Sequence, residues 1–216
     1  CDLEGQTFTI RRATGHGSEL EGEYWIPLLG RHQLENAANA IATLAVLRER
    51  GWRIPADAVR VGMRRVDWPG RMEVLNRVPL LIADGAHNPR SAEILCAALA
   101  EWFPGRRWVM IFGASDDKDI AGMLNVLLPM SEHVIVTRSD HPRAAAPSRL
   151  ADVAATLGRG AEISVNVKKA LQRGLAVRQP ESGLLVTGSL HLVADAREAW
   201  ADHTGSAADR PDRDTE

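Results

Sequence analysis

The stretch Leu80-Leu81-Ile82-Ala83-Asp84-Gly85-Ala86-His87-Asn88-Pro89 decides the fold of this chain. Its first four residues are all apolar, which is typical of a strand that is buried on both faces of a parallel sheet. Asn88 suits the cap before a helix and Pro89 suits its first turn, so the stretch predicts a strand, a turn and a helix. Asp84 and His87 then stand at the carboxyl end of the strand, where open α/β sheets bind their ligands.

Apolar runs and amphipathic segments continue to alternate along residues 67–203. The apolar runs predict strands at residues 72–75, 78–83, 108–112, 133–137, 161–165 and 184–187. The amphipathic spacing predicts helices at about residues 89–102, 118–128, 148–157, 167–177 and 190–202. This alternation indicates an α/β fold with a Rossmann-like, mostly parallel sheet that carries helices on both faces.

Residues 1–66 follow a different pattern. Two strand-like pieces and two helices are expected there, at residues 8–10, 24–26, 33–50 and 55–65. In the first helix, spacings of three and four residues predict one buried face, made of Ala37, Ala40, Ile41, Leu44 and Leu47.

Asp67-Trp68-Pro69-Gly70 breaks the pattern, and we place a hinge there. It separates a first domain at residues 1–66 from a second at residues 67–203. The polar residues 204–216 are expected to form a disordered tail. Because the sequence opens in mid-pattern with Cys1 and not with Met, we expect it to be a fragment of a longer protein or a product trimmed at its start.

Composition argues against several classes of function. The formal net charge is −2 and no basic patch dominates, so nucleic acid is not the expected partner. No apolar run approaches membrane-spanning length and no signal peptide is recognisable, so we expect a cytoplasmic protein without a membrane partner. Cys1 and Cys96 form neither a metal motif nor a disulfide framework.

Four further polar positions are candidates for a binding site. Asn36 can present an amide to a planar base, or only cap the helix that it opens. Arg71 can bind phosphate through its forked, permanent charge, or be a solvated surface residue. Lys118 and Ser189 each follow a predicted strand, where they can meet an anion or belong to an ordinary helix start. His141-Pro142-Arg143 gives a weaker signal, and we interpret it as a surface turn.

The loops that carry Asp84, Lys118 and Ser189 all fall at the carboxyl ends of strands in one predicted sheet. Because parallel strands end at the same edge, we expect these three side chains to converge there.

Five motifs of this chain together resemble one family. They are His32-Gln33 with Asn36-Ala37, Pro69-Gly70-Arg71, Asp84-Gly85-Ala86-His87-Asn88-Pro89, Asp117-Lys118-Asp119 and Gly188-Ser189-Leu190. In this order they resemble the carboxyl-terminal part of the folylpolyglutamate synthase / dihydrofolate synthase family, within the Mur ligase superfamily. The third motif is the specific one, because peptidoglycan-building relatives usually carry a different sequence there.

The resemblance implies an ATP-dependent ligase of folate biosynthesis and one-carbon metabolism. Such an enzyme activates a folate or dihydropteroate carboxylate as an acyl phosphate, which the amino group of L-glutamate then attacks. ATP and Mg²⁺ are the implied cofactors. By position in the motifs, Asn36 would face adenine, Arg71 the phosphates and Asp84 the ribose.

The same resemblance assigns the remaining site residues. His87 would lie close to the terminal phosphate, and Lys118 and Ser189 would lie near the incoming amino acid or the acyl phosphate. His87 and Lys118 are therefore the expected catalytic residues, and Lys118 and Ser189 the expected substrate-binding residues.

The chain departs from the family in one respect. The family's Gly-rich phosphate loop, its magnesium ligands and its carbamylated Lys belong to a central ATPase domain, and no Gly-x-x-x-x-Gly-Lys-Ser/Thr pattern occurs in this chain. Residues 1–66 therefore resemble only the end of that domain. We expect the metal ligands to lie upstream, and no ligase activity from this chain alone.

Two other functions stay open: another amino-acid-adding Mur-like ligase, and a non-catalytic Rossmann-like nucleotide-binding module. The sequence decides neither between dihydrofolate synthesis and polyglutamate extension nor the oligomeric state.

Overall fold

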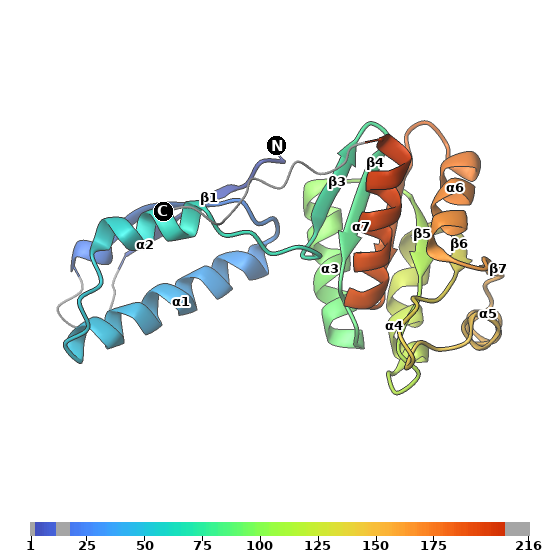
Figure 1. Cartoon of the computed structure of the whole chain (residues 1–216), viewed down its shortest axis with the longest axis horizontal. Helices are drawn as coiled ribbons and strands as arrows, with labels where there is room; N and C mark the ends of the chain where they lie inside the picture. Colours follow the sequence, from blue (N-terminus) through green and yellow to red (C-terminus); the bar gives the residue numbers. More distant parts are fainter. Residues whose placement is uncertain (1–2, 12–17, 206–216) are drawn as a thin grey trace. The chain divides into compact units, whose positions relative to one another are not determined.

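The computed structural model describes residues 3–11 and 18–205 of the chain. This part separates into two compact units, whose elements are labelled in Figure 1. The first unit contains Cys1–Glu73 and Ala98–Pro104, and the second contains Val74–Ala97 and Gly105–Glu216. Each unit has a buried apolar cluster of its own. None of the described helices is both long and apolar enough to cross a membrane.

The first unit combines an antiparallel ribbon with two helices in its described part. Strands β1 (Gln6–Ile10) and β2 (Gly22–Ile26) pair along their whole length, and the short 3-10 helix η1 (Ser18–Leu20) precedes β2. Helices α1 (Arg31–Glu49) and α2 (Ala56–Arg64) follow. The buried core of this unit comprises Leu20, Tyr24, Ile41, Ala45 and Val59.

Helix α1 buries a narrower face than its sequence predicts. Ala37 and Ile41 are buried as expected, but Ala40 is exposed, and Leu44 and Leu47 are only half-buried. Ile41 belongs to the buried core. Ala40 and Leu44 line an open groove together with residues of α2, and Leu44 also packs against the core.

A sheet of six described strands forms the centre of the second unit. Its spatial order is β3-β4-β8-β5-β6-β7. These strands are β3 (Glu73–Arg77), β4 (Leu80–Asp84), β5 (Trp108–Phe112), β6 (Ser131–Val136), β7 (Glu162–Ile163) and β8 (Gly183–Thr187). The pairs β4–β8, β8–β5, β5–β6 and β6–β7 are all parallel. The last described strand in sequence order, β8, therefore lies between β4 and β5.

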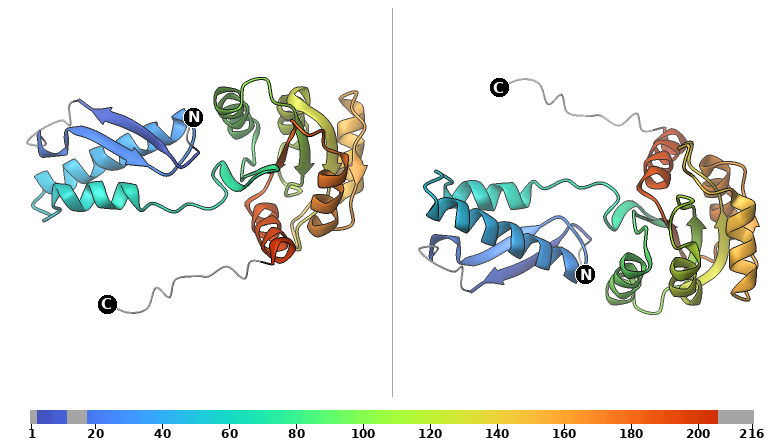
Figure 2. Two further views of the ribbon diagram at one scale, coloured as in Figure 1. Left: turned by 90° about the horizontal axis from the view of Figure 1, so that it is seen from above. Right: turned by 90° about the horizontal axis from the view of Figure 1, so that it is seen from below.

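Helices cover both faces of this sheet, as Figure 2 shows. They are α3 (Pro89–Trp102), α4 (Ile120–Leu127), α5 (Pro147–Thr156), α6 (Val167–Val177) and α7 (Leu190–Thr204), with the 3-10 turn η2 (Leu128–Met130) after α4. Helices α3, α4 and α5 lie on one side, and α6 and α7 lie on the other. Strand residues such as Leu81, Ile111 and Val186 form one buried cluster with side chains of α6 and α7. Their neighbours Ile82 and Met110 are fully buried as well, as a sheet covered on both faces requires.

These observations confirm the α/β fold that the sequence predicts. Strand β5 and helices α3 and α6 have the expected bounds. Strand β7, however, has two residues, Glu162–Ile163, instead of the five expected at 161–165. Asn166 accepts a hydrogen bond from Lys169 N (2.9 Å) and caps α6, which begins at Val167 as expected. Helix α7 runs to Thr204, and residues 206–216 of the expected tail lie outside the described residues.

The central strand β5 provides a test of this core. Ile111→Ala should lower the free energy of unfolding by roughly 2–5 kcal/mol, because a fully buried side chain would leave a cavity among α6, α7 and the sheet. The matched control Ile163→Ala removes the same atoms from a side chain that is 52% exposed, and it should cost about 1 kcal/mol or less. Urea denaturation followed by circular dichroism measures both. Equal costs for the two variants would contradict the layered core.

Candidate functional site

The carboxyl ends of three neighbouring strands meet at one level of the sheet. Asp84 of β4 is paired in register with Thr187 of β8, and Thr187 is paired with Phe112 of β5. Asp84 is the last residue of β4, and His87 lies in the turn that follows it. Ser189 lies in the segment after β8, and Lys118 lies in the segment after β5. The backbone segments that carry these residues therefore begin at one edge of the sheet.

Thr187 lies at the centre of this edge and is fully buried. Its hydroxyl oxygen has no hydrogen-bond partner in the described part of the chain. Buried polar groups are nearly always satisfied, so an unpaired hydroxyl at this position suits an edge that binds a polar group.

Asp84 is almost buried, at 7% exposure. Its Oδ1 accepts a hydrogen bond from the backbone N–H of Ala86 at 2.8 Å, which fixes the turn after β4. Asn88 Oδ1 accepts from Ser91 N at 2.8 Å and caps α3, which begins at Pro89 as expected. The carboxylate is thus held rigidly at the strand end, and each carboxylate oxygen can accept more than one hydrogen bond.

His87 is half-buried beside Asp84, and its ring orientation is set by the backbone. Its Nδ1 lies 2.9 Å from the carbonyl oxygen of Gly85, which can only accept, so Nδ1 carries a proton. In the neutral ring Nε2 is then an acceptor. His87 can therefore donate from Nε2 to a phosphate oxygen only as the imidazolium.

Lys118 follows β5 in a polar segment. Its Nζ lies 3.1 Å from Asp117 Oδ2, and its backbone N–H donates to Ser115 O at 3.1 Å. The hydrogen bond from Lys118 lowers the pKa of the Asp117 carboxyl, and the charge of Arg143 adds to that effect. Lys118 is half-buried and carries a compact positive charge at the end of a flexible side chain, which suits an anionic ligand.

Ser189 caps helix α7 after β8. It is nearly buried, and its Oγ accepts from His191 N at 3.2 Å. The preceding Gly188 has φ 109°, and a Cβ there would lie 2.6 Å from Gly113 O and 2.7 Å from a ring carbon of Phe112. The ends of β8 and β5 are therefore in close contact, which places the Ser189 and Lys118 segments beside each other.

Sequence reasoning missed a histidine pair at the same edge. The rings of His141, in the segment after β6, and His191, in the first turn of α7, stack with centroids 3.9 Å apart and an interplanar angle of 16°. The sequence around His141 predicts a surface turn, and this prediction does not include the stacking on His191. The stacking could not be predicted, because it joins two residues that lie far apart in the sequence.

Asn36 and Arg71 belong to the first unit. Asn36 Nδ2 donates to Gln33 Oε1 at 3.1 Å, and Gln33 Nε2 lies 3.1 Å from His32 Nε2. Partial burial lowers the pKa of His32, and the charge of Arg71 lowers it further. The Arg71 guanidinium carbon lies 5.8 Å from the centroid of the Trp68 indole.

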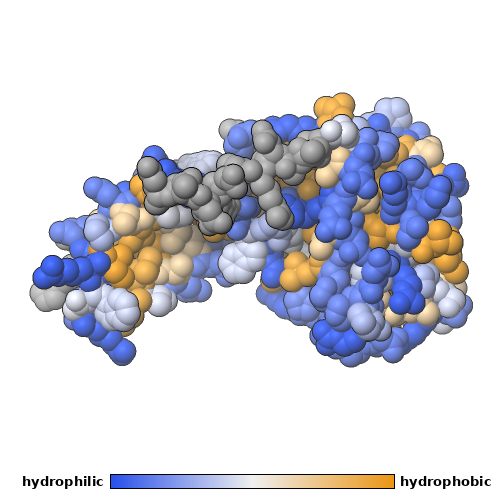
Figure 3. Space-filling view, viewed as in Figure 1, coloured by the Kyte–Doolittle hydropathy of each residue, from blue (hydrophilic) through white to orange (hydrophobic). Residues whose placement is uncertain are grey.

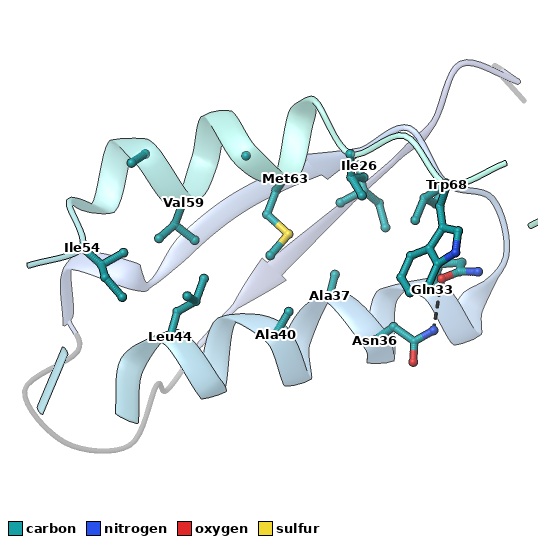
Figure 4. Close-up of a pocket in the computed structure, with 14 residues that line it drawn as sticks. Ile26, Gln33, Asn36, Ala37, Ala40, Leu44, Ile54, Val59, Met63 and Trp68 are labelled. Carbon is teal, nitrogen blue, oxygen red and sulfur yellow. Dashed lines mark hydrogen bonds between the residues drawn. The ribbon is translucent and has the colours of Figure 1, made fainter. Parts of the chain in front are cut away.

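An apolar cavity of about 360 Å³ lies between α1 and α2 of this unit. Figure 4 shows Gln33, Asn36 and Trp68 at one end of it, with Ile54 and Leu44 at the other. Figure 3 shows the apolar surface over the same two helices. The cavity thus offers an amide and an aromatic ring at the end of an otherwise apolar groove, a combination that suits a planar heterocycle.

The described residues contain no group of three or more His, Cys, Asp or Glu side chains that could hold a metal ion.

Comparisons with known proteins agree with this geometry. Residues 70–190 match the family model for the glutamate ligase domain of Mur ligases. Over 176 residues the chain is 36% identical to the probable bifunctional folylpolyglutamate synthase/dihydropteroate synthase of Haloferax volcanii, covering 81% of this chain and 20% of that protein. It is 31% identical to folylpolyglutamate synthase of Lacticaseibacillus casei over 198 residues, covering 90% of this chain and 43% of that one.

A solved structure is similar as well. Mycobacterium tuberculosis folylpolyglutamate synthase complexed with ADP and AMPPCP matches with a TM-score of 0.73 at 30% identity, covering 90% of this chain and 48% of that chain. The chain therefore spans less than half the length of each of these relatives.

The close approach of β8 to β5 can be tested at Gly188. Gly188→Ala should destabilise the second unit by roughly 2–5 kcal/mol, because it combines a strained backbone with a clash against Gly113 O. Gly158→Ala is the matched control. Gly158 also has positive φ (76°), but nothing lies within 4 Å of a Cβ there, so only the backbone cost of about 1–2 kcal/mol remains. Thermal unfolding of both variants decides, and a Gly188→Ala variant as stable as the control would refute the close contact.

Proposed function

Because the chain belongs to the Mur ligase family through its glutamate ligase domain, we propose that it forms the carboxyl-terminal part of an ATP-dependent ligase that adds L-glutamate to a folate or dihydropteroate carboxylate. One observation carries this proposal: Asp84 ends one strand of the matched domain, and Lys118 and Ser189 follow two others, the three strands being neighbours in the order β4-β8-β5. We assign residues 67–203 to that domain and residues 1–66 to the end of a central ATPase domain. We place the enzyme in the cytoplasm.

The proposed reaction has two steps. A carboxylate oxygen of the folate or dihydropteroate attacks the γ-phosphorus of ATP, which forms an acyl phosphate and releases ADP. The amino nitrogen of L-glutamate then attacks the acyl carbon, loses a proton and expels inorganic phosphate as the amide bond forms. Both steps shift negative charge on phosphate oxygens, so cations that are held in place stabilise the transition states most.

We assign nucleotide recognition to Asn36, Arg71 and Asp84. The Asn36 carboxamide lies at the polar end of the apolar cavity, where it can both donate to and accept from the edge of adenine. The Asp84 carboxylate suits the ribose hydroxyls, because it is an acceptor that its own turn holds in place. The Arg71 guanidinium suits phosphate oxygens by its fork and permanent charge.

We assign the reacting groups to His87, Lys118 and Ser189. Lys118 would balance the charge of the acyl phosphate or hold a carboxylate of the incoming glutamate. His87 would donate from Nε2 to the terminal phosphate in its protonated form, since Nδ1 is occupied by Gly85 O. Ser189 would present its hydroxyl beside the first turn of α7. Mg²⁺ would accompany ATP, with its protein ligands in the portion of the relatives that this chain does not match.

The test joins this chain to the amino-terminal portion of a folylpolyglutamate synthase and measures ATP-dependent incorporation of labelled glutamate. We expect incorporation into dihydropteroate or a folate with release of one ADP per amide, and none from the 216-residue chain alone. The intact relative serves as the positive control. A chimaera that folds and binds ATP, but transfers an amino acid only to a peptidoglycan precursor, would assign the chain to another Mur-like ligase. A chimaera that binds ATP and forms no amide would leave it as a nucleotide-binding module.

Asp84 provides the sharpest test of nucleotide recognition. Asp84→Asn keeps an oxygen for the N–H of Ala86 but removes the charge, so it should weaken ATP binding about tenfold while the fold is retained. Isothermal titration calorimetry on the chimaera measures the effect. Asp152→Asn, which neutralises an exposed carboxylate on α5, is the control and should bind ATP normally. An unchanged affinity in Asp84→Asn and Asp84→Ala alike would reduce Asp84 to a turn residue.

A further inference from the structure

The segment between β6 and α5, residues 137–146, is hydrogen-bonded to the segment that carries Lys118. Asp116 N donates to Arg143 O at 2.8 Å, and Ala145 N donates to Ala114 O at 2.9 Å. Through these two backbone bonds, the conformation of residues 137–146 fixes that of residues 113–119.

The same segment also contacts α7, through one hydrogen bond and one pair of stacked rings. The backbone N–H of Asp140 donates to Asp195 Oδ2 at 3.2 Å. One residue later, the ring of His141 stacks on the ring of His191 with centroids 3.9 Å apart. The loop of residues 137–146 thus connects the Lys118 segment to the first turns of α7.

The hydrogen bonding of His141 determines which of its two ring nitrogens carries the proton in the neutral form. Its Nδ1 accepts a hydrogen bond from the backbone N–H of Arg143 at 3.2 Å. Since Nδ1 accepts, the proton of the neutral ring resides on Nε2. Protonation would place a second N–H at Nδ1, facing the N–H of Arg143, and the bond that shapes the turn would be lost.

The charges around the pair also favour the neutral ring. Partial burial lowers the pKa of His141, and the neighbouring His191 and Arg143 lower it further. On α7, burial raises the pKa of the Asp195 carboxyl, the hydrogen bond from Asp140 N lowers it, and the charges of Asp140 and Glu198 raise it. From the Lys118 side, Asp116 is paired with Arg149 and Asp117 with Lys118.

We infer that His141 is a positioning residue, which in its neutral form accepts from Arg143 N, stacks on His191, and thereby orders the segment that carries Lys118. Loss of this order on acidification is the direct consequence. The consequence for glutamate addition rests on the proposed function of Lys118, whereas the ordering itself does not.

The sign of the pH effect follows from the lowered pKa of His141. Well above the ordinary histidine pKa of about 6.5, the ring is neutral in the folded and unfolded states alike, and residues 137–146 have their full stability. As the pH falls below that value, the unfolded or opened segment takes up a proton more readily than the native turn. Order is therefore lost as the pH falls, and raising the pH restores it.

Amide hydrogen exchange of the 216-residue chain tests this inference, with rates corrected for the intrinsic effect of pH. Between about pH 7.5 and pH 5, the amides of residues 113–119 and 138–146 should lose about tenfold in protection. His141→Asn should abolish the pH effect, because an Asn oxygen can accept from the N–H two residues on and does not titrate. His141→Phe keeps a stacked ring but lacks the acceptor, so protection should be low at both pH values.

Two controls accompany these variants. His203→Asn removes a histidine from the far end of α7 and should behave as the unmodified chain. The amides of β5 report whether each variant is folded. Equal protection of the unmodified chain at both pH values would overturn the inference, and so would a pH effect that persists in His141→Asn or full protection in His141→Phe. Because the readout is protection and not turnover, a failed glutamate assay would count against the proposed function alone.

Discussion

Strand β8 is the last of the described strands in sequence order, and it lies between β4 and β5 with parallel pairing to both. The sheet is continuous only when this strand is inserted. Glycines at both of its ends allow the fit: a Cβ at Gly183 would lie 2.5 Å from the ring of Trp108, and one at Gly188 would lie 2.6 Å from Gly113 O. Side chains at these positions would hold β8 away from β5, so backbone proximity is the constraint on which the architecture rests.

The candidate site depends on the same insertion. Without β8, the strands that end at Asp84 and Phe112 are not neighbours, and the side chains of Asp84 and Lys118 have no fixed relation to each other. With β8 in place, the two strand ends and Ser189 share one edge and one level. Assembly of the site and completion of the sheet are thus a single event, which links the stability of the fold to the geometry of its chemistry.

The elements buried on both faces were predictable from sequence, because continuous apolar runs leave few alternatives; β5 has the bounds expected of it. The resemblance seen in the motifs is likewise confirmed by the family match. Features that depend on contacts between distant parts of the chain were not predictable. Ala40 and Leu44 have helical spacing but line an open groove, and the stacking of His141 on His191 joins residues that only the tertiary fold brings together.

The sequence left open whether the polar residues at this edge cap helices or bind ligands, and the structure makes these two roles compatible. Asp84 Oδ1 serves the turn after β4, and Ser189 Oγ serves the first turn of α7, yet a carboxylate and a hydroxyl each have acceptor capacity beyond one bond. A local hydrogen bond fixes the side chain before any ligand arrives, which removes part of the conformational entropy that binding would otherwise cost. Helix-start chemistry at the ends of β4 and β8 therefore fixes these two side chains, and the neutral ring of His141 orders the neighbouring loop by the same kind of local bond.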